Sequence, residues 1–257
     1  MSECIRVINL DRSPDRFARF IERHPGVPIE RFSAVDGFKI DRDTCVINGL
    51  ITNINEYTPG AFGNMMSHLA LWRECSEGSE PYHIVEDDAT LRHDFLSVTS
   101  ALLDTLDGWD VVLWAHNFDW PLQIRPAQGL GVAVVQYDDE AMDAVAIKSF
   151  LQDCVKPMLL PLFSAAGVCC YSISPRGAVR MLSDCLPIGR EPASYLEKRR
   201  TAWMNTAIDV EMSRHYGDWR AYVALPPMAI TDNDQNVSTV QGRSAAHLAA
   251  LHHAVIT

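Results

Sequence analysis

Three consecutive carboxylates follow a short apolar run in this chain. They are Glu86, Asp87 and Asp88, directly after Tyr82-His83-Ile84-Val85. Adjacent negative charges repel one another, so such a cluster at a strand end usually accompanies a positive group. A divalent cation that carries a diphosphate is the natural candidate, because Mg²⁺ and Mn²⁺ bind carboxylate oxygens together with substrate phosphates. The alternative is an acidic turn that holds no metal.

An alternation of strands and helices must position these carboxylates. Strands are predicted at residues 4–10, 29–35, 82–86, 109–114, 132–137, 168–174 and 220–224. Helices are predicted after Ser13 and after Ser174, and at residues 60–75, 95–106 and 206–216. This order predicts an α/β architecture with a mixed, largely parallel sheet flanked by helices.

Polar residues stand at three places where a predicted strand stops. Ligands of α/β sheets bind outside the carboxyl ends of the strands, so we expect the chemistry of this protein at that edge. The three groups are Asn9-Leu10-Asp11, Asp36-Gly37 and Glu86-Asp87-Asp88.

Local signals predict several boundaries. Ser13 and Ser174 each precede a proline, a pattern in which serine caps a helix and proline occupies its first position. Apolar residues recur at i, i+4 and i+7 up to Trp72, which predicts one buried stripe on the helix at 60–75 and places Trp72 in the core. Residues 39–59 are predicted as loop with one short helix, and residues 115–131 as loop.

The composition is that of a globular protein. Of 257 residues, 47% are hydrophobic and 21% charged, which is enough apolar material for a sizeable core. No apolar run approaches the ~20 residues that span a bilayer, and the N-terminus carries no signal-peptide pattern, so we expect a cytoplasmic protein without a transmembrane segment. The cysteines form no C-x-x-C pair, which favours reduced, mostly buried thiols. They are Cys4, Cys45, Cys75, Cys154, Cys169, Cys170 and Cys185.

The net charge of −11 argues against a nucleic acid or an anionic membrane as partner, because both attract a positive field. Arg190 with Lys198-Arg199-Arg200 forms a dense basic patch, interpreted as a solvated helix face. No repeat, low-complexity tract or linker divides the chain. Residues 1–243 are therefore predicted as one domain, and residues 244–257 as a C-terminal helical tail.

Four segments of the chain form an ordered set. They are Val7-Ile8-Asn9-Leu10-Asp11-Arg12-Ser13-Pro14-Asp15-Arg16, Ala34-Val35-Asp36-Gly37, Gly63-Asn64-Met65-Met66-Ser67-His68 with Trp72, and Val85-Glu86-Asp87-Asp88-Ala89. In that order they resemble glycosyltransferase family 25, which includes bacterial lipooligosaccharide galactosyltransferases and collagen hydroxylysine galactosyltransferases. Two later segments, residues 167–182 with Tyr171 and Ala207-Ile208-Asp209, support the resemblance, which covers residues 4–240.

The resemblance implies a GT-A-like, Rossmann-type fold and a nucleotide-sugar donor, usually a UDP-sugar. It also implies transfer of the sugar, galactose or a related hexose, with inversion to a hydroxyl of a glycan, glycolipid or glycopeptide acceptor. Mn²⁺ or Mg²⁺ would bridge the diphosphate of the donor. Glu86 and Asp88 are the expected metal ligands, Asp88 the more direct one, since strand alternation would put both on one side if it continues that far.

Residues of the donor pocket follow from the same motifs. Arg16, one turn into its helix, offers a fork that suits a phosphate, unless Asp15 and Arg16 only decorate a solvated helix. Asp36 would accept hydrogen bonds from the uracil imide or the ribose, because Gly37 lets the backbone approach a base; a plain turn is the alternative. The expected donor-site residues are Asn9, Leu10, Asp11, Arg16, Asp36, Gly37, Ser67, His68, Glu86, Asp87 and Ser238.

Two of these residues have competing interpretations. Ser67 and His68 would contact ribose or phosphate, while the alternative for His68 is a buried, hydrogen-bonded core histidine. Adjacent serine and histidine do not form a hydrolase triad, which needs the base to face the nucleophile. Ser238 lies in the polar loop 231–241, which the resemblance places near the donor.

Asp209 is the expected general base. Inversion needs one carboxylate to take the proton of the acceptor hydroxyl. An acidic residue at the start of a helix also stabilises the helix without any chemistry, which is the competing interpretation. Asp232 and Asp234 are the next candidates.

Two other functions remain open from the residues. One is a nucleotide-sugar-fold protein that has lost catalysis and serves in binding or assembly. The other is a metal-dependent phosphohydrolase or nucleotidyltransferase, which would use the same carboxylates but lacks a second pair arranged for two metals.

Overall fold

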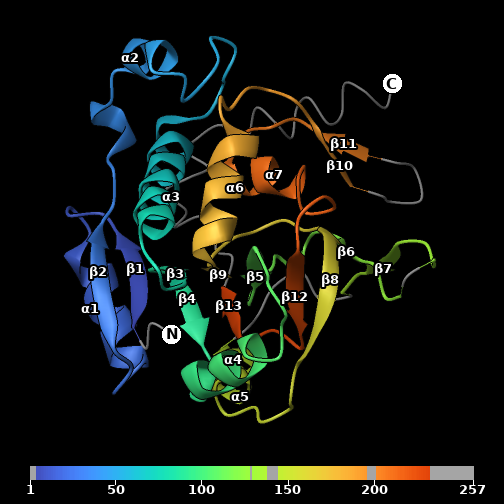
Figure 1. Cartoon of the computed structure of the whole chain (residues 1–257). Coiled ribbons are helices and arrows are strands. Elements are labelled where there is room, and N and C mark those ends of the chain that lie inside the picture. The colour runs from blue at the N-terminus through green and yellow to red at the C-terminus, as the bar shows by residue number, and fades with distance from the viewer. Residues whose placement is uncertain (1–3, 128, 138–143, 196–200, 232–257) are drawn as a thin grey trace, which may run out of the picture.

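A computed structural model of the chain describes residues 4–127, 129–137, 144–195 and 201–231. Within these residues, nine strands form one mixed sheet (Figure 1). In spatial order they are β2 (Ile29–Ser33), β1 (Ile5–Asn9), β3 (Tyr82–Glu86), β9 (Cys170–Ile173), β5 (Val111–Leu113), β12 (Ala221–Leu225), β8 (Met158–Ser164), β6 (Leu122–Ile124) and β7 (Ala133–Val135).

The sheet is parallel where the three predicted polar strand ends meet. β1 pairs in parallel with both β2 and β3, and β5 pairs in parallel with β12. β9, β8 and β7 run against the other strands. The predicted α/β class with a mixed, largely parallel sheet is therefore confirmed. Smaller ladders join β4 (Ala89–Leu91) to β13 (Ala229–Thr231) and β10 (Ala193–Tyr195) to β11 (Thr201–Trp203).

Helices cover both faces of the sheet. Strand alternation sends Ile84 and Tyr171 into one apolar core and their neighbours Val85 and Cys170 into the other. The first core packs against α3 (Pro59–Glu77), α6 (Pro175–Cys185) and α7 (Ile208–Ser213), of which α3 and α6 lie side by side (Figure 1). The second packs against α1 (Pro14–Arg23) and α4 (Phe95–Leu103). Short helices η1 (Gly37–Lys39), α2 (Arg42–Ile47) and α5 (Ala144–Leu151) complete the described fold.

Most local boundaries agree with the sequence patterns. Ser174 caps α6, because its hydroxyl accepts a hydrogen bond from the Gly177 amide at 3.0 Å. Pro14 opens α1 as predicted, but the Ser13 side chain makes no capping hydrogen bond. The short helix predicted within residues 39–59 is α2, and Trp72 is fully buried in the core.

Two predictions about elements are wrong. Residues 115–131 are not all loop, because they contain β6. The strand that pairs with β6 is β8, which lies far along the chain and carries Pro161, a residue atypical of an interior strand. Nor does α3 bury a single stripe. Its buried residues lie on several faces, because the helix is packed between the sheet, α6, α7 and η1.

Other predictions concern the surface and the thiols. The cysteines are free, and all except Cys4 and Cys154 are buried, as predicted. Arg190 forms an ion pair with Glu56 at 3.0 Å. Among the described residues, no helix is long and apolar enough to span a bilayer. The predicted tail at 244–257, and the domain boundary before it, lie outside the described residues.

Candidate active site

A cavity opens at the carboxyl ends of β1, β2 and β3. Its walls come from the residues that follow these strands and from the first turns of α1 and α3. The lining residues are Ile8, Leu10, Arg12, Ser13, Arg16, Ala34, Val35, Asp36, Gly37, Phe38, Pro59, Gly60, Asn64, Ser67, Glu86, Asp87 and Asp88.

Asp87 anchors the acidic wall of the cavity. Its carboxylate accepts a hydrogen bond from Asn9 Nδ2 at 2.6 Å and forms an ion pair with Arg16. Burial raises the pKa of Asp87 above its ordinary value, and these two partners oppose that effect. Asn9 also donates to the Ser13 carbonyl at 3.0 Å, so Asp87 ties the end of β3 to the start of α1.

Asp88 is the accessible carboxylate of the triplet, with a side chain 41% exposed. Its Oδ2 lies 3.4 Å from Arg16 Nη2. The strand ends at Glu86 and the chain turns at 87–88 before β4 begins, so the alternation considered for residues 86 and 88 does not continue through the triplet. All three carboxylates instead line the cavity.

Glu86 is held by side chains of α3. Its Oε1 accepts hydrogen bonds from Asn64 Nδ2 at 2.7 Å and from His68 Nε2 at 3.2 Å. Burial opposes the charge of Glu86, but His68, Asn64 and Arg16 together outweigh it and hold the pKa of Glu86 below its ordinary value. Glu86 is therefore ionised and fixed in direction.

A chain of hydrogen bonds continues behind Glu86 into the core. Trp72 Nε1 donates to the Tyr171 hydroxyl at 2.7 Å, and the same hydroxyl lies 2.8 Å from His68 Nδ1. Burial raises the pKa of Tyr171 well above its ordinary value, so the hydroxyl keeps its proton and can donate it to Nδ1. His68 thus links the two groups, with Nδ1 next to the Tyr171 hydroxyl and Nε2 directed at Glu86 Oε1.

Tyr171→Phe should destabilise the protein. The change leaves the Trp72 indole N–H and His68 Nδ1 buried without their partner, and an orphaned buried polar group costs about 1–3 kcal/mol. We expect the free energy of unfolding to fall by about 2 kcal/mol or more in a urea titration. Tyr222→Phe on β12, a half-buried tyrosine of the same sheet, is the control. Equal stability of the two variants would contradict the assigned hydrogen-bond chain.

The opposite wall of the cavity is built on the turn after β2. Asp36 Oδ2 pairs with Arg12 Nη1 at 2.6 Å, and this hydrogen bond lowers the pKa of Asp36. Gly37 lies directly against α3, where an added Cβ would lie 1.9 Å from the Pro59 carbonyl oxygen. The Ser67 hydroxyl accepts from the Val35 amide at 2.9 Å and donates to the Gly63 carbonyl at 2.8 Å. These contacts fix the turn on the helix.

Asp209 lies at the same edge of the sheet, outside the lining of this cavity. Its Oδ2 accepts a hydrogen bond from the Gly167 amide at 2.9 Å, while Glu86 N donates to the Cys169 carbonyl at 2.8 Å. One short segment before β9 thus contacts both the Asp209 carboxylate and the Glu86 backbone. Burial raises the pKa of Asp209, and the charge of Glu86 acts in the same direction. Gly167 has φ +85°, a conformation that favours glycine.

The predicted donor-site and metal residues that the structure describes fall into three groups. Leu10, Arg16, Asp36, Gly37, Ser67 and the acidic triplet line the cavity. Behind them, Asn9 and His68 are buried and support Asp87 and Glu86. Asp11 stands apart with a side chain 73% exposed, where it pairs with Arg31 at 2.7 Å. Ser238, Asp232 and Asp234 lie outside the described residues.

A divalent cation fits the acidic wall. Asp88 offers an accessible carboxylate, and Glu86 lines the same cavity in ionised form. Two carboxylates with room for phosphate oxygens are what Mg²⁺ or Mn²⁺ takes in such sites. Asp87 fits the role less well, because Asn9 and Arg16 already engage both of its oxygens.

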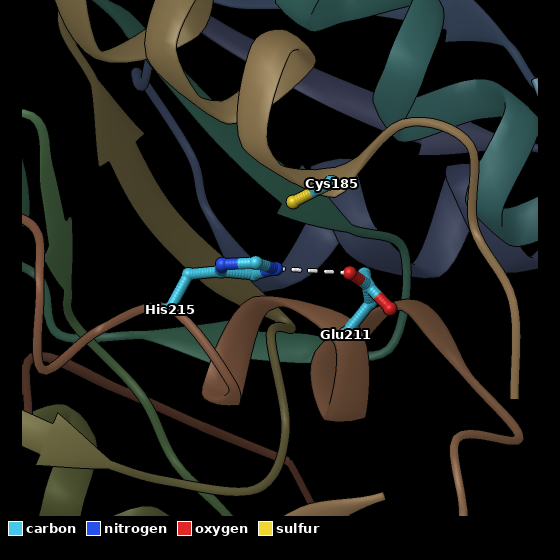
Figure 2. A group of neighbouring side chains, drawn as sticks. All are labelled: Cys185, Glu211 and His215. Carbon is cyan, nitrogen blue, oxygen red and sulfur yellow. Dashed lines mark hydrogen bonds and ion pairs between the residues drawn. The ribbon is translucent and has the colours of Figure 1, made fainter. Parts of the chain in front are cut away.

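A second group of potential ligands lies between α6 and α7 (Figure 2). Ligand atoms of Cys185, Glu211 and His215 lie within 4.8 Å of one another. Both Glu211 oxygens are already engaged, one by Arg214 at 2.7 Å and His215 at 3.0 Å, the other by Asn205. Burial raises the pKa of the Cys185 thiol well above its ordinary value. We therefore interpret the group as structural. Its buried contacts hold α7, the helix that carries Asp209, in position.

Sequence reasoning missed several residues around the cavity. Arg12 and Phe38 line it, although only their neighbours Asp11 and Gly37 are predicted as site residues from the sequence. Asn64 and Tyr171 stand in quoted motifs without an assigned role, although both act on Glu86, Asn64 directly and Tyr171 through His68. The signal for Asn64 was its helical spacing of four residues from His68, which places both side chains on one face of α3.

Two comparisons with known proteins bear on the family of the chain. A family model described as "Glycosyltransferase family 25 (LPS biosynthesis protein)" matches residues 3–192. No curated protein matches the chain significantly.

Proposed function

The chain belongs to glycosyltransferase family 25, and from that premise we propose that it transfers a hexose from a UDP-sugar to an acceptor hydroxyl with inversion. Galactose or a related hexose is the proposed sugar, on a GT-A type fold. The observation that carries the proposal is the cavity itself, where four carboxylates and two arginines meet at the carboxyl edge of parallel strands. α/β folds bind nucleotides at this edge.

The donor diphosphate is proposed to bind at the acidic wall. Glu86 and Asp88 would hold Mn²⁺ or Mg²⁺, and Arg16, fixed by Asp87, adds a positive charge beside them. A metal ion bound there supplies Lewis-acid stabilisation of the charge that develops on the departing nucleotide. Arg16 favours the same charge through its guanidinium.

The acceptor is proposed to react beside Asp209. The Asp209 carboxylate takes the proton as the acceptor O–H bond breaks, and the acceptor oxygen forms a bond to the anomeric carbon of the sugar. The bond from that carbon to the phosphate oxygen breaks on the opposite face, and UDP leaves with the electron pair. The raised pKa of Asp209 makes it a stronger base than an exposed aspartate. A glycan, glycolipid or glycopeptide would supply the hydroxyl.

UDP together with Mn²⁺ should stabilise the protein against heat. A ligand that binds only the folded state adds ~2.7 kcal/mol at a hundredfold excess over its Kd. We expect the melting temperature to rise with UDP and Mn²⁺ together by more than with either alone. No shift with UDP or with any other nucleoside diphosphate at millimolar concentration would contradict the donor site.

A second measurement separates catalysis from binding alone. Release of UDP from a UDP-sugar, followed with and without Mn²⁺, reports slow hydrolysis even when the acceptor is unknown. A protein that binds UDP but releases none from any UDP-sugar, with or without glycan acceptors, would be a binding protein rather than a transferase.

A further inference from the structure

Phe38 is an exposed aromatic ring at the mouth of the cavity. Its residue is 72% exposed, although it lines the same cavity as the acidic triplet. Removing an aromatic ring from water is favourable, so an exposed ring that lines a cavity offers a contact surface to a ligand bound there.

The backbone that carries this ring is held in place. The Asp36 carboxylate accepts a hydrogen bond from the Phe38 amide at 3.3 Å while it pairs with Arg12. Gly37 packs so closely on α3 that an added Cβ would lie 1.9 Å from the Pro59 oxygen and 2.6 Å from the Gly63 nitrogen. The turn that carries Phe38 is therefore wedged against a buried helix.

The cavity has two chemically different ends. Arg16 and the carboxylates of residues 86–88 form a charged end. Phe38 forms a flat apolar end, and the Arg12 guanidinium lies 5.9 Å from its ring centroid. A ligand that matches both ends carries an anionic group that can share a metal ion at one end and a planar ring at the other.

We propose that Phe38 is the stacking platform for the nucleobase of a nucleoside diphosphate, an inference that rests on the proposed donor site. The base lies against the exposed face of the ring, and the diphosphate extends toward Arg16 and Asp88. Aromatic rings stack on any base, because every base has a π-face. Phe38 therefore contributes to affinity, and the polar groups around it determine which base is preferred.

The test compares two probes on the intact chain. Calorimetry with Mn²⁺ present gives the Kd of UDP and of inorganic pyrophosphate, which has the anionic end but no base. Phe38→Ala should weaken UDP about tenfold or more, as expected for a lost base stack. Pyrophosphate binding should change by less than about twofold, since it does not reach the ring.

Two control variants sharpen the result. Phe38→Tyr keeps an aromatic face and should restore UDP affinity to within about threefold of the original protein. Ile47→Ala removes an apolar side chain that is 83% exposed on α2 and outside the cavity lining, so it should change neither Kd.

The outcomes separate this inference from the proposed function. Unchanged UDP affinity in Phe38→Ala overturns the stacking role and leaves the donor site intact. Equal weakening of UDP and pyrophosphate also overturns it, because the turn rather than the base contact would then matter. Absence of UDP binding by the original protein overturns the proposed donor and the stacking role together.

Discussion

Replacing Asp209 with asparagine is expected to lower kcat by about 10²- to 10⁴-fold, the usual contribution of a general base. Asparagine still offers an oxygen to the Gly167 amide, the hydrogen bond that Asp209 accepts at 2.9 Å. The fold of this edge should therefore persist. Donor affinity should stay within about twofold, because the base acts on the acceptor in the transition state.

The measurement combines steady-state turnover with the Kd of UDP in the presence of Mn²⁺. Hydrolysis of the UDP-sugar can serve as the readout until an acceptor is found. Asp184→Asn is a matched control, since Asp184 is an acid on the neighbouring helix α6 and accepts its hydrogen bond from Trp219. A kcat of Asp209→Asn within about threefold of the original would move the base elsewhere, with Asp232 and Asp234 next.

The pH profile adds an independent check on the same residue. Asp209 must be a carboxylate to accept a proton, and burial raises its pKa above the ordinary value. Activity should therefore be full above that raised pKa and fall as the pH decreases through it. The asparagine variant should lose this acidic limb, which a merely structural role would leave unchanged.

The local part of the site could be predicted from the sequence. A strand that ends in three carboxylates, and serine–proline pairs before helices, are patterns of adjacent residues, and they place the acidic triplet and α6 correctly. Which of the three carboxylates is accessible and which is buried could not be predicted from the sequence. Asp87 is engaged by Asn9, 78 residues away in the chain, and by Arg16, so packing rather than alternation leaves Asp88 accessible.

The non-local part of the fold could not be predicted for related reasons. β8 carries Pro161 and β6 is short, so neither has a strong pattern of its own, and each forms because its partner strand supplies the hydrogen bonds. The hydrogen bonds that run from Trp72 through Tyr171 and His68 to Glu86 likewise join α3 to β9 across about a hundred residues of sequence. Such contacts depend on the sheet order, which periodicity does not contain.

Asp88→Asn is expected to abolish most metal-dependent donor binding while the fold remains intact. Changes to groups that only support metal ligands cost about 10- to 100-fold in metal affinity, so loss of a charged ligand should cost at least about 100-fold. Asp88 is 41% exposed, so replacing its carboxylate by an amide of the same shape should change stability little. Mn²⁺ titration followed by UDP binding measures the effect.

Asp87→Asn is the matched control at the adjacent position. Its carboxylate is buried between Asn9 and Arg16, so its loss should lower the free energy of unfolding by about 1–3 kcal/mol. The two variants should thus show different defects: Asp88→Asn should lose metal binding, and Asp87→Asn should lose stability. If Asp88→Asn keeps the metal dependence of UDP binding, the ligand is Glu86 or Asp87. The hydrogen bonds from Asn64 and His68 to Glu86 Oε1 would then serve to orient the Glu86 carboxylate toward the ion.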